Sequence, residues 1–261
     1  MNLDLTGKYA LVCGSTQGIG KASAIELAKL GANVTLVARD ENKLKEVVKE
    51  LDTTKKQKHN YIVADFTKPE ELKKKIEAHA KNNIVHILLN NTGGPAGGPI
   101  LEAKTEEFTQ ALSNHLICNH ILVQAVVGGM KKEKYGRIIN IISTSVKQPI
   151  KGLGVSNTIR AAVANWSKTL AGELGPFGIT VNNILPGATN TERLNSLIDA
   201  RAKKAGISAK DESQEWLKEI PAGRFADASE IAAAAAFLAS PAASYINGIN
   251  LPVDGGRTGS L

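Results

Sequence analysis

Short apolar runs alternate with longer amphipathic segments along almost the whole chain, and this alternation constrains the fold more than any other feature. The apolar runs have the length of buried strands. We expect strands at 9–12, 34–37, 61–64, 84–89, 137–142, 180–184 and 249–252. Between them, apolar residues recur at helical spacing, with the main helices expected near 19–28, 44–51, 72–80, 105–132, 156–174 and 230–238. Strands that alternate with helices in this way form βαβ units. The pattern predicts a doubly wound Rossmann-type α/β fold with a mostly parallel seven-stranded sheet.

The length of the chain and the absence of a linker predict one domain. The 261 residues contain no Pro/Ser-rich linker and no internal repeat, so we expect a single domain over 1–261. Residues 191–219 interrupt the strand and helix alternation with a helical insert. In an open parallel sheet, ligands bind beyond the carboxyl ends of the strands, where the strand order reverses.

The charge and composition exclude several classes of function. The net charge is +7, but the lysines are spread over helical segments and aromatic residues are only 4% of the chain, so no nucleic-acid partner is expected. A basic surface also suits an anionic, phosphate-bearing ligand. The longest apolar run, 231–239, is about half a membrane span, so we expect no membrane anchor. Cys13 and Cys118 form no CxxC pair, and the first residues do not resemble a signal peptide, so we expect the cytoplasm.

A glycine-rich loop follows the first expected strand. It reads Gly14-Ser15-Thr16-Gln17-Gly18-Ile19-Gly20 and leads directly into a helix. In this context glycines let the backbone turn tightly and approach a pyrophosphate, while the helix N-terminus supplies positive potential. The loop therefore predicts a dinucleotide-binding site.

The residues after the second and third strands bear on the choice of cofactor. A carboxylate after the second strand would hydrogen-bond the adenosine ribose and repel a 2′-phosphate, but this chain has Arg39 there. A charge-assisted bond from arginine contributes roughly 1.5–3 kcal/mol, which predicts that NADP(H) is preferred over NAD(H) by about ten- to a hundredfold. The alternative is an exposed arginine with no ligand. Asp65, with Phe66 beside it, is placed to meet the adenine, although Asp65 could instead cap a helix.

At this point the chain resembles the short-chain dehydrogenase/reductase family. The glycine loop is similar to that family's TGxxxGIG motif, Asn90-Asn91-Thr92-Gly93 to NNAG, Pro186-Gly187 with Thr191 to PGxxxT, and Val253-Asp254-Gly255-Gly256 to VDGG. The resemblance covers nearly the whole chain and is strongest to the 3-oxoacyl-(acyl carrier protein) reductase branch. It implies that further residues hold the cofactor, namely Asn91, Thr92, Gly93, Pro186, Gly187, Thr189 and Thr191.

The catalytic residues depart from this family. The family has Ser, then Tyr thirteen residues later, then Lys four further on; Ser143 fits the first place, but Ser156 and Arg160 occupy the other two. The family's helix Asn falls near His115, with Asn114 one place away. We identify the chain with an atypical subgroup that has SxxxR in place of YxxxK.

These substitutions change the acid chemistry. A serine hydroxyl is a much weaker acid than a phenol, and arginine does not deprotonate. We name Ser143, Ser156, Arg160 and His115 as catalytic candidates, with Arg160 also contacting the nicotinamide ribose and water supplying the proton. Each has a structural alternative: a satisfied hydroxyl for Ser143, a helix N-cap for Ser156, a surface charge for Arg160 and an inert helix histidine for His115.

The resemblance also implies a substrate lid and an oligomer. The insert at 191–219 lies where the family has its lid, and its mixed apolar and basic residues suit an acyl thioester. A homotetramer or homodimer through the helices near 105–132 and 156–174 is implied. We expect an NADP(H)-dependent oxidoreductase that interconverts a carbonyl and an alcohol, with a 3-oxoacyl thioester as a candidate substrate. The alternative is a catalytically silent dinucleotide-binding protein that acts as a sensor or partner subunit.

Overall fold

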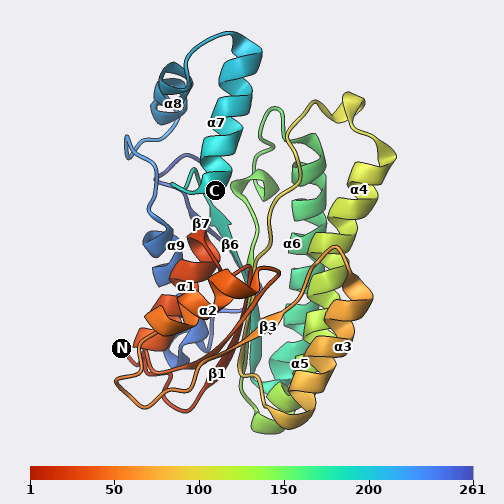
Figure 1. Cartoon of the computed structure of the whole chain (residues 1–261), viewed down its shortest axis with the longest axis vertical. Helices are drawn as coiled ribbons and strands as arrows, with labels where there is room; N and C mark the ends of the chain where they lie inside the picture. The colour runs from red at the N-terminus through yellow and green to blue at the C-terminus, as the bar shows by residue number, and fades with distance from the viewer. Residues whose placement is uncertain (261) are drawn as a thin grey trace.

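The chain folds around a parallel sheet that two layers of helices cover (Figure 1). The structure is a computed structural model that describes residues 1–260. Its strands are β1 (Tyr9–Cys13), β2 (Asn33–Ala38), β3 (Asn60–Val63), β4 (Ile87–Asn90), β5 (Gly136–Ile141), β6 (Ile179–Pro186) and β7 (Asn250–Val253). They are ordered β3-β2-β1-β4-β5-β6-β7, and every neighbouring pair is parallel. The predicted doubly wound Rossmann-type fold is confirmed, with all seven strands parallel.

The helices divide between the two faces of the sheet. One face carries α1 (Gly18–Lys29), α2 (Glu41–Glu50) and α9 (Ala228–Ala239), and the other carries α3 (Pro69–Asn82), α5 (Cys118–Glu133) and α6 (Gly154–Leu174) (Figure 1). The side chains of β1 show why both faces are apolar. Val12 packs among the first group of helices and Leu11 among the second, because successive residues of a strand point to opposite faces.

The long helix expected at 105–132 is interrupted, which corrects the sequence prediction. It consists of α4 (Thr105–Leu112), a π-helical segment (Ser113–Ile117) and α5. A π segment inserts an extra residue into the turn without breaking the apolar pattern, so periodicity alone does not show it. Short 3₁₀ segments lie at Ile100–Glu102, Thr144–Val146, Gly175–Phe177 and Pro241–Ala243.

The insert forms two helices beyond the carboxyl edge of the sheet. These are α7 (Glu192–Ala205) and α8 (Ala209–Lys218), and Figure 1 shows them above the strand ends. Leu194 and Ile198 of α7 pack on Trp216 of α8, which makes the pair a small packed unit. Within residues 1–260, no helix has both the length and the apolarity to cross a membrane. The expected location in the cytoplasm stays a prediction.

A row of asparagine amides, three of them buried, crosses four adjacent strands. Asn90 Nδ2 donates to Asn140 Oδ1 at 2.8 Å, Asn140 Nδ2 to Asn183 Oδ1 at 2.9 Å, and Asn183 Nδ2 to Asn250 Oδ1 at 2.8 Å. The strand register places each pair directly opposite. Asn90, Asn140 and Asn183 are buried, so their amides need partners inside the protein, and the head-to-tail row provides at least one to each. The row links Asn90, the last residue of β4, to Asn250, the first residue of β7.

Candidate functional site

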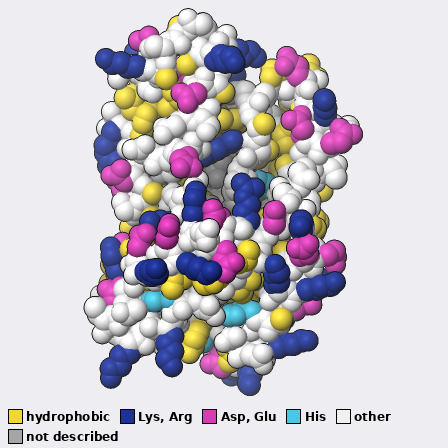
Figure 2. All heavy atoms as spheres, viewed as in Figure 1, with side chains coloured by type: hydrophobic (Ala, Val, Ile, Leu, Met, Phe, Trp, Pro, Cys, Tyr) yellow, Lys and Arg dark blue, Asp and Glu magenta, His cyan; other side chains and the backbone are white. Residues whose placement is uncertain are grey.

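A cavity of about 610 Å³ opens at the carboxyl edge of the sheet, beneath the α7–α8 pair. It is lined by the residues that follow six of the strands, from β1 to β6. In the face shown in Figure 2, Lys and Arg side chains surround this hollow. The cavity therefore lies where a doubly wound sheet binds its ligands.

Most of the residues predicted for the site line this one cavity. They are Gly14, Thr16, Gln17, Gly18, Ile19, Arg39, Asp65, Phe66, Asn91, Thr92, Gly93, Ser143, Ser156, Arg160, Pro186, Gly187, Thr189 and Thr191. Ser15, Gly20 and His115 do not line it. The single fold thus gathers residues from across the sequence, while their individual roles stay predictions.

The glycine loop has the conformation that its sequence requires. Gly14 and Gly18 have φ of +58° and +54°, a region that other residues rarely adopt. Ser15 points away from the cavity; it is buried and its hydroxyl donates to the Val37 carbonyl at 3.4 Å. Gly20 packs against the loop itself. These two residues therefore shape the loop rather than its surface.

The N-terminus of α1 presents unpaired backbone N–H groups to the cavity. Gln17 is its N-cap residue and makes no side-chain capping bond, and its side-chain amide donates to Glu192 Oε2 at 2.8 Å. The first-turn N–H groups of a helix have no partner within the helix. Together with the helix dipole they form an anion site. This end of the cavity fits a pyrophosphate.

A second basic region lies after β2. Arg39 and Lys43 both line the cavity and are exposed at its rim. Lys43 lies in the first turn of α2, which Asp40 caps by accepting the Lys43 N–H at 3.1 Å. Lys43 was not predicted, although the capping pattern after the strand contained the signal. Two cations at this position fit the 2′-phosphate of a dinucleotide.

Asp65 is not the helix cap that the sequence left open. The N-cap of α3 is Lys68, and Asp65 Oδ1 accepts the Thr67 N–H at 2.9 Å in a turn before the helix. This hydrogen bond lowers the pKa of the Asp65 carboxyl, and Arg39 contributes to the same shift. Asp65 is therefore an anionic acceptor beside the basic region.

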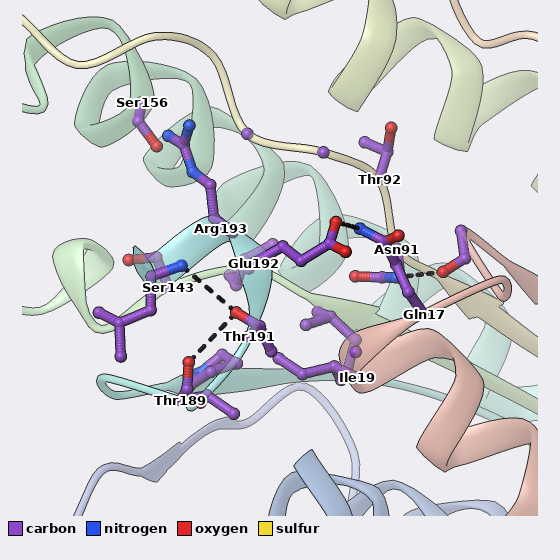
Figure 3. A pocket seen from close by; sticks show the side chains of 18 of the residues that line it. Gln17, Ile19, Asn91, Thr92, Ser143, Ser156, Thr189, Thr191, Glu192 and Arg193 are labelled. Atoms are coloured by element: carbon purple, nitrogen blue, oxygen red, sulfur yellow. Dashed lines mark hydrogen bonds between the residues drawn. The ribbon is translucent and has the colours of Figure 1, made fainter. Parts of the chain in front are cut away.

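Asn91 ties the ends of β1 and β4 together. Its side-chain amide donates to the carbonyls of Cys13 at 3.3 Å and Gly14 at 3.2 Å. On the opposite wall, Thr191 donates to the Thr189 carbonyl at 3.1 Å and caps α7 (Figure 3). These bonds hold the cavity walls in place from both sides.

The catalytic candidates meet at the other end of the cavity. Ser156 is the third residue of α6, whose N-cap is Leu153, so the alternative role of Ser156 as a helix N-cap is wrong. Arg160, one turn later, is buried rather than a surface charge, with 9% exposure, and its Nη1 donates to the Ile141 carbonyl at 2.9 Å. Ser143 caps the following 3₁₀ turn by accepting the Ser145 N–H. Two hydroxyls and one guanidinium therefore share this end.

His115 lies behind these residues, in the π-helical segment. It is buried with 3% exposure and hydrogen-bonds the backbone of Gly93. Burial, with Arg160 and Arg193 nearby, lowers the pKa of His115 to about 2. The imidazole is therefore neutral and does not itself face the cavity, so we assign it no contact with a ligand.

The start of α7 and the segment after β7 contribute groups that were not among the predicted site residues. Arg193, in the first turn of α7, lines the cavity and donates to the Pro95 carbonyl. Arg257 also lines it and pairs with Glu219. The position of Arg257 just after the VDGG motif was the available signal. Among residues 1–260, no cluster of His, Cys, Asp or Glu could hold a metal ion.

Comparison with known proteins identifies relatives over the whole domain. A family model described as enoyl-(acyl carrier protein) reductase matches residues 14–258. The chain is 34% identical over 255 residues to a 3-oxoacyl-(acyl-carrier-protein) reductase of Vibrio cholerae, covering 97% of this chain and 98% of that protein.

Solved structures also include reductases that are similar to this chain over nearly its whole length. L-sorbose reductase of Gluconobacter frateurii, solved with NADPH and L-sorbose, has a TM-score of 0.92 and 32% identity, with full coverage of both chains. An actinorhodin polyketide ketoreductase with NADPH has a TM-score of 0.90 and 30% identity, covering 97% of this chain and 98% of that one.

Proposed function

Because the chain belongs to the short-chain dehydrogenase/reductase family, whose members are NAD(P)-dependent oxidoreductases, we propose that it uses NADP(H) to interconvert a carbonyl group and an alcohol. One observation carries this proposal: a single cavity joins a phosphate-binding helix N-terminus to two buried hydrogen-bond donors, Ser156 and Arg160. Two structural relatives that were solved with NADPH support the same cofactor.

Different residues of the chain contact different parts of the cofactor. The glycine loop and the N-terminus of α1 hold the pyrophosphate, and Arg39 with Lys43 holds the 2′-phosphate, from which we infer a preference for NADP(H) over NAD(H). Asp65 and Phe66 meet the adenine, while Arg160 and the 186–191 segment meet the nicotinamide half. When bound, the nicotinamide supplies or accepts a hydride.

The proton chemistry follows from what is present at the catalytic end. The hydroxyls of Ser143 and Ser156 hydrogen-bond the substrate oxygen, and the Arg160 guanidinium stabilises negative charge on it. Neither group is an acid near neutral pH. A water molecule therefore delivers the proton. Loss of general-acid catalysis costs about 10²–10⁴-fold in rate, whereas orientation of the carbonyl retains about 7–11 kcal/mol.

The substrate of the Vibrio cholerae relative makes a 3-oxoacyl thioester a candidate. The lining of the cavity includes Leu153, Leu197 and Trp216, which provide an apolar surface for a substrate chain. We infer that the α7–α8 pair acts as the lid over a small carbonyl compound.

We also propose that the protein works as a homotetramer or homodimer. Leu101, Leu112 and Ile117, on the segment that leads through α4 into α5, are exposed apolar side chains. A second copy of this chain would bury them. A monomer by light scattering would contradict this assembly.

A second candidate function is a silent dinucleotide-binding protein. The observation that favours it is the absence of a phenol and an ammonium at positions 156 and 160. Such a protein would bind NADPH and consume none.

The deciding experiment measures NADPH binding and NADPH consumption separately. We expect the purified chain to quench or shift NADPH fluorescence on binding and to oxidise it with at least one member of a panel of ketones, aldehydes, oxo acids and 3-oxoacyl thioesters. Ser156→Ala should lower turnover, whereas Thr158→Ala, at an exposed site two residues along α6, should not. Binding without turnover across the panel would instead support the silent protein.

A further inference from the structure

Two arginines without acidic partners lie at the catalytic end of the cavity. Arg160 comes from α6 and Arg193 from the first turn of α7, and both line the cavity. Neither takes part in an ion pair anywhere in the described chain. Each donates one hydrogen bond, to the carbonyls of Ile141 and Pro95 respectively. A guanidinium has five N–H donors, so most of theirs are available to a ligand.

The acidic residues that line the cavity accept hydrogen bonds from groups other than the two arginines. Asp40 caps α2, Asp65 accepts the Thr67 N–H, and Glu192 accepts the amide of Gln17. Burial is the main cause that lowers the pKa of Arg160, and its proximity to Arg193 adds to the shift. Two like charges brought together in a partly enclosed site repel each other, and a bound anion removes that cost.

This charge lies apart from the groups assigned to the cofactor phosphates. Figure 3 shows the Arg193 guanidinium extending toward Ser156, on the opposite side of the cavity from Gln17 and Ile19 of the glycine loop. Arg193 also packs over the loop after β4, since a β-carbon on Gly94 would lie 3.2 Å from its Nη2. The anion that it would bind is therefore on the substrate.

An apolar wall adjoins the two arginines. Leu197 lies four residues after Arg193, on the same side of α7. A β-carbon on Gly97 would be 3.4 Å from Leu153 and 3.7 Å from Leu197, so these two side chains converge there. A hydrocarbon group beside an anionic group matches this combination.

We propose that this end of the cavity binds an oxo acid, with Arg193 holding its carboxylate and Arg160 facing the reacting carbonyl oxygen. This inference rests on the proposed function and narrows its substrate to a free acid rather than a neutral ketone or thioester. In the reduction, the carbonyl carbon gains the hydride of NADPH, the π electron pair moves to oxygen, and that oxygen takes a proton from water. The products are the hydroxy acid, NADP⁺ and the hydroxide left by the water molecule, which the buffer neutralises.

The test titrates 4-methyl-2-oxopentanoate and its methyl ester into the chain saturated with NADP⁺, by calorimetry. The oxidised cofactor cannot reduce the carbonyl, so the readout is binding alone. We expect the acid to bind about 10- to 100-fold more tightly than the ester. The advantage should weaken in high salt. Equal affinity, or no binding of the acid, would overturn the inference.

Three variants test whether Arg193 binds the carboxylate of the oxo acid. Arg193→Gln should remove the advantage of the acid, and Arg193→Lys should keep part of it, because lysine retains the charge without the planar fork. Lys203→Gln removes a charge from the same helix but from outside the cavity lining, so it should leave the acid's affinity unchanged. Unchanged affinity in folded Arg193→Gln would overturn the assignment.

The two proposals fail in different ways. Turnover of neutral ketones with the same kcat/KM as the matched oxo acids would leave the oxidoreductase standing and overturn the oxo-acid inference. Tight, salt-sensitive binding of the acid without NADPH oxidation would retain the anion site and remove the proposed function. If NADP⁺ itself does not bind, titration of the acid into the cofactor-free protein still decides the anion site.

Discussion

Gly20 packs against the backbone of Gly14 so closely that a β-carbon on Gly20 would lie 2.1 Å from the Gly14 carbonyl oxygen. Real β-carbons do not approach that distance, so any side chain at Gly20 must push the loop away from α1. The loop that faces the cavity is therefore shaped by a residue that does not itself face it.

We expect Gly20→Ala to weaken NADPH binding by at least about tenfold and to destabilise the fold by about 1–3 kcal/mol through overpacking. Fluorescence titration and denaturant unfolding measure the two effects. Gly128→Ala is the matched control: Gly128 lies in α5 with open space where its β-carbon would go, so alanine there should be neutral or stabilising. Equal behaviour of the two variants would refute the packing argument.

Arg39 at the end of β2 should determine the choice between the two dinucleotides. Arg39→Ala removes one of the two cations at the cavity rim there, so the affinity for NADPH should fall by about 10- to 100-fold. The affinity for NADH should hardly change, because it lacks the 2′-phosphate. Parallel titrations with both cofactors give the ratio, and a parallel loss for both would show that Arg39 acts on the fold instead.

Ser156 should act on turnover and not on cofactor binding. Removing one donor to a developing oxyanion lowers kcat by about 10²–10³-fold in well-organised sites. We expect Ser156→Ala to approach that loss while the Kd for NADPH stays the same. Steady-state kinetics and titration separate the two. A Ser156→Ala protein with unaltered kcat would remove Ser156 from the catalytic groups.

His115 should make the protein sensitive to acid. Its pKa is about 6.5 when unfolded and about 2 when folded, so below pH 6.5 the unfolded chain binds a proton that the folded chain does not. The free energy of unfolding should therefore decrease as pH falls, by up to about 1.4 kcal/mol per pH unit from this residue. His115→Asn should lose that dependence between pH 6.5 and 4.5.

Urea unfolding at several pH values measures this difference. His120→Asn, at an exposed site on α5, serves as the control and should follow the wild type. If the free energy of unfolding has the same pH slope in the wild type and in His115→Asn, then His115 takes up its proton in the folded protein as it does in the unfolded chain.

The fold and the glycine loop of the site could be predicted from the sequence, because both depend on local patterns. Short apolar runs that alternate with segments of period-3.6 spacing predicted the parallel sheet, and glycines at positions 14 and 18 predicted a loop whose φ angles only glycine favours. The π-helical turn at His115 escaped prediction, since one extra residue leaves the apolar spacing nearly unchanged.

Arg193 illustrates the other limit. On the sequence it was one of several basic residues in the insert, and nothing local separated it from Lys203 or Lys204. Only the packing of α7 over the strand ends brings it to the same end of the cavity as Arg160. Apolar periodicity also misplaced the start of α6. The helix begins two residues earlier than the periodicity indicated, so Ser156 is not its N-cap.

The asparagine row from Asn90 to Asn250 has a direction, because each amide gives its proton to the next and none can turn alone without facing donor to donor. At its start, Asn90 Oδ1 is buried without a partner in the described chain. The row therefore behaves as one polarised unit, and its unpaired acceptor lies in β4, one residue before Asn91, which lines the cavity. A substitution at any one of the four asparagines should therefore disturb the hydrogen bonds of the whole row.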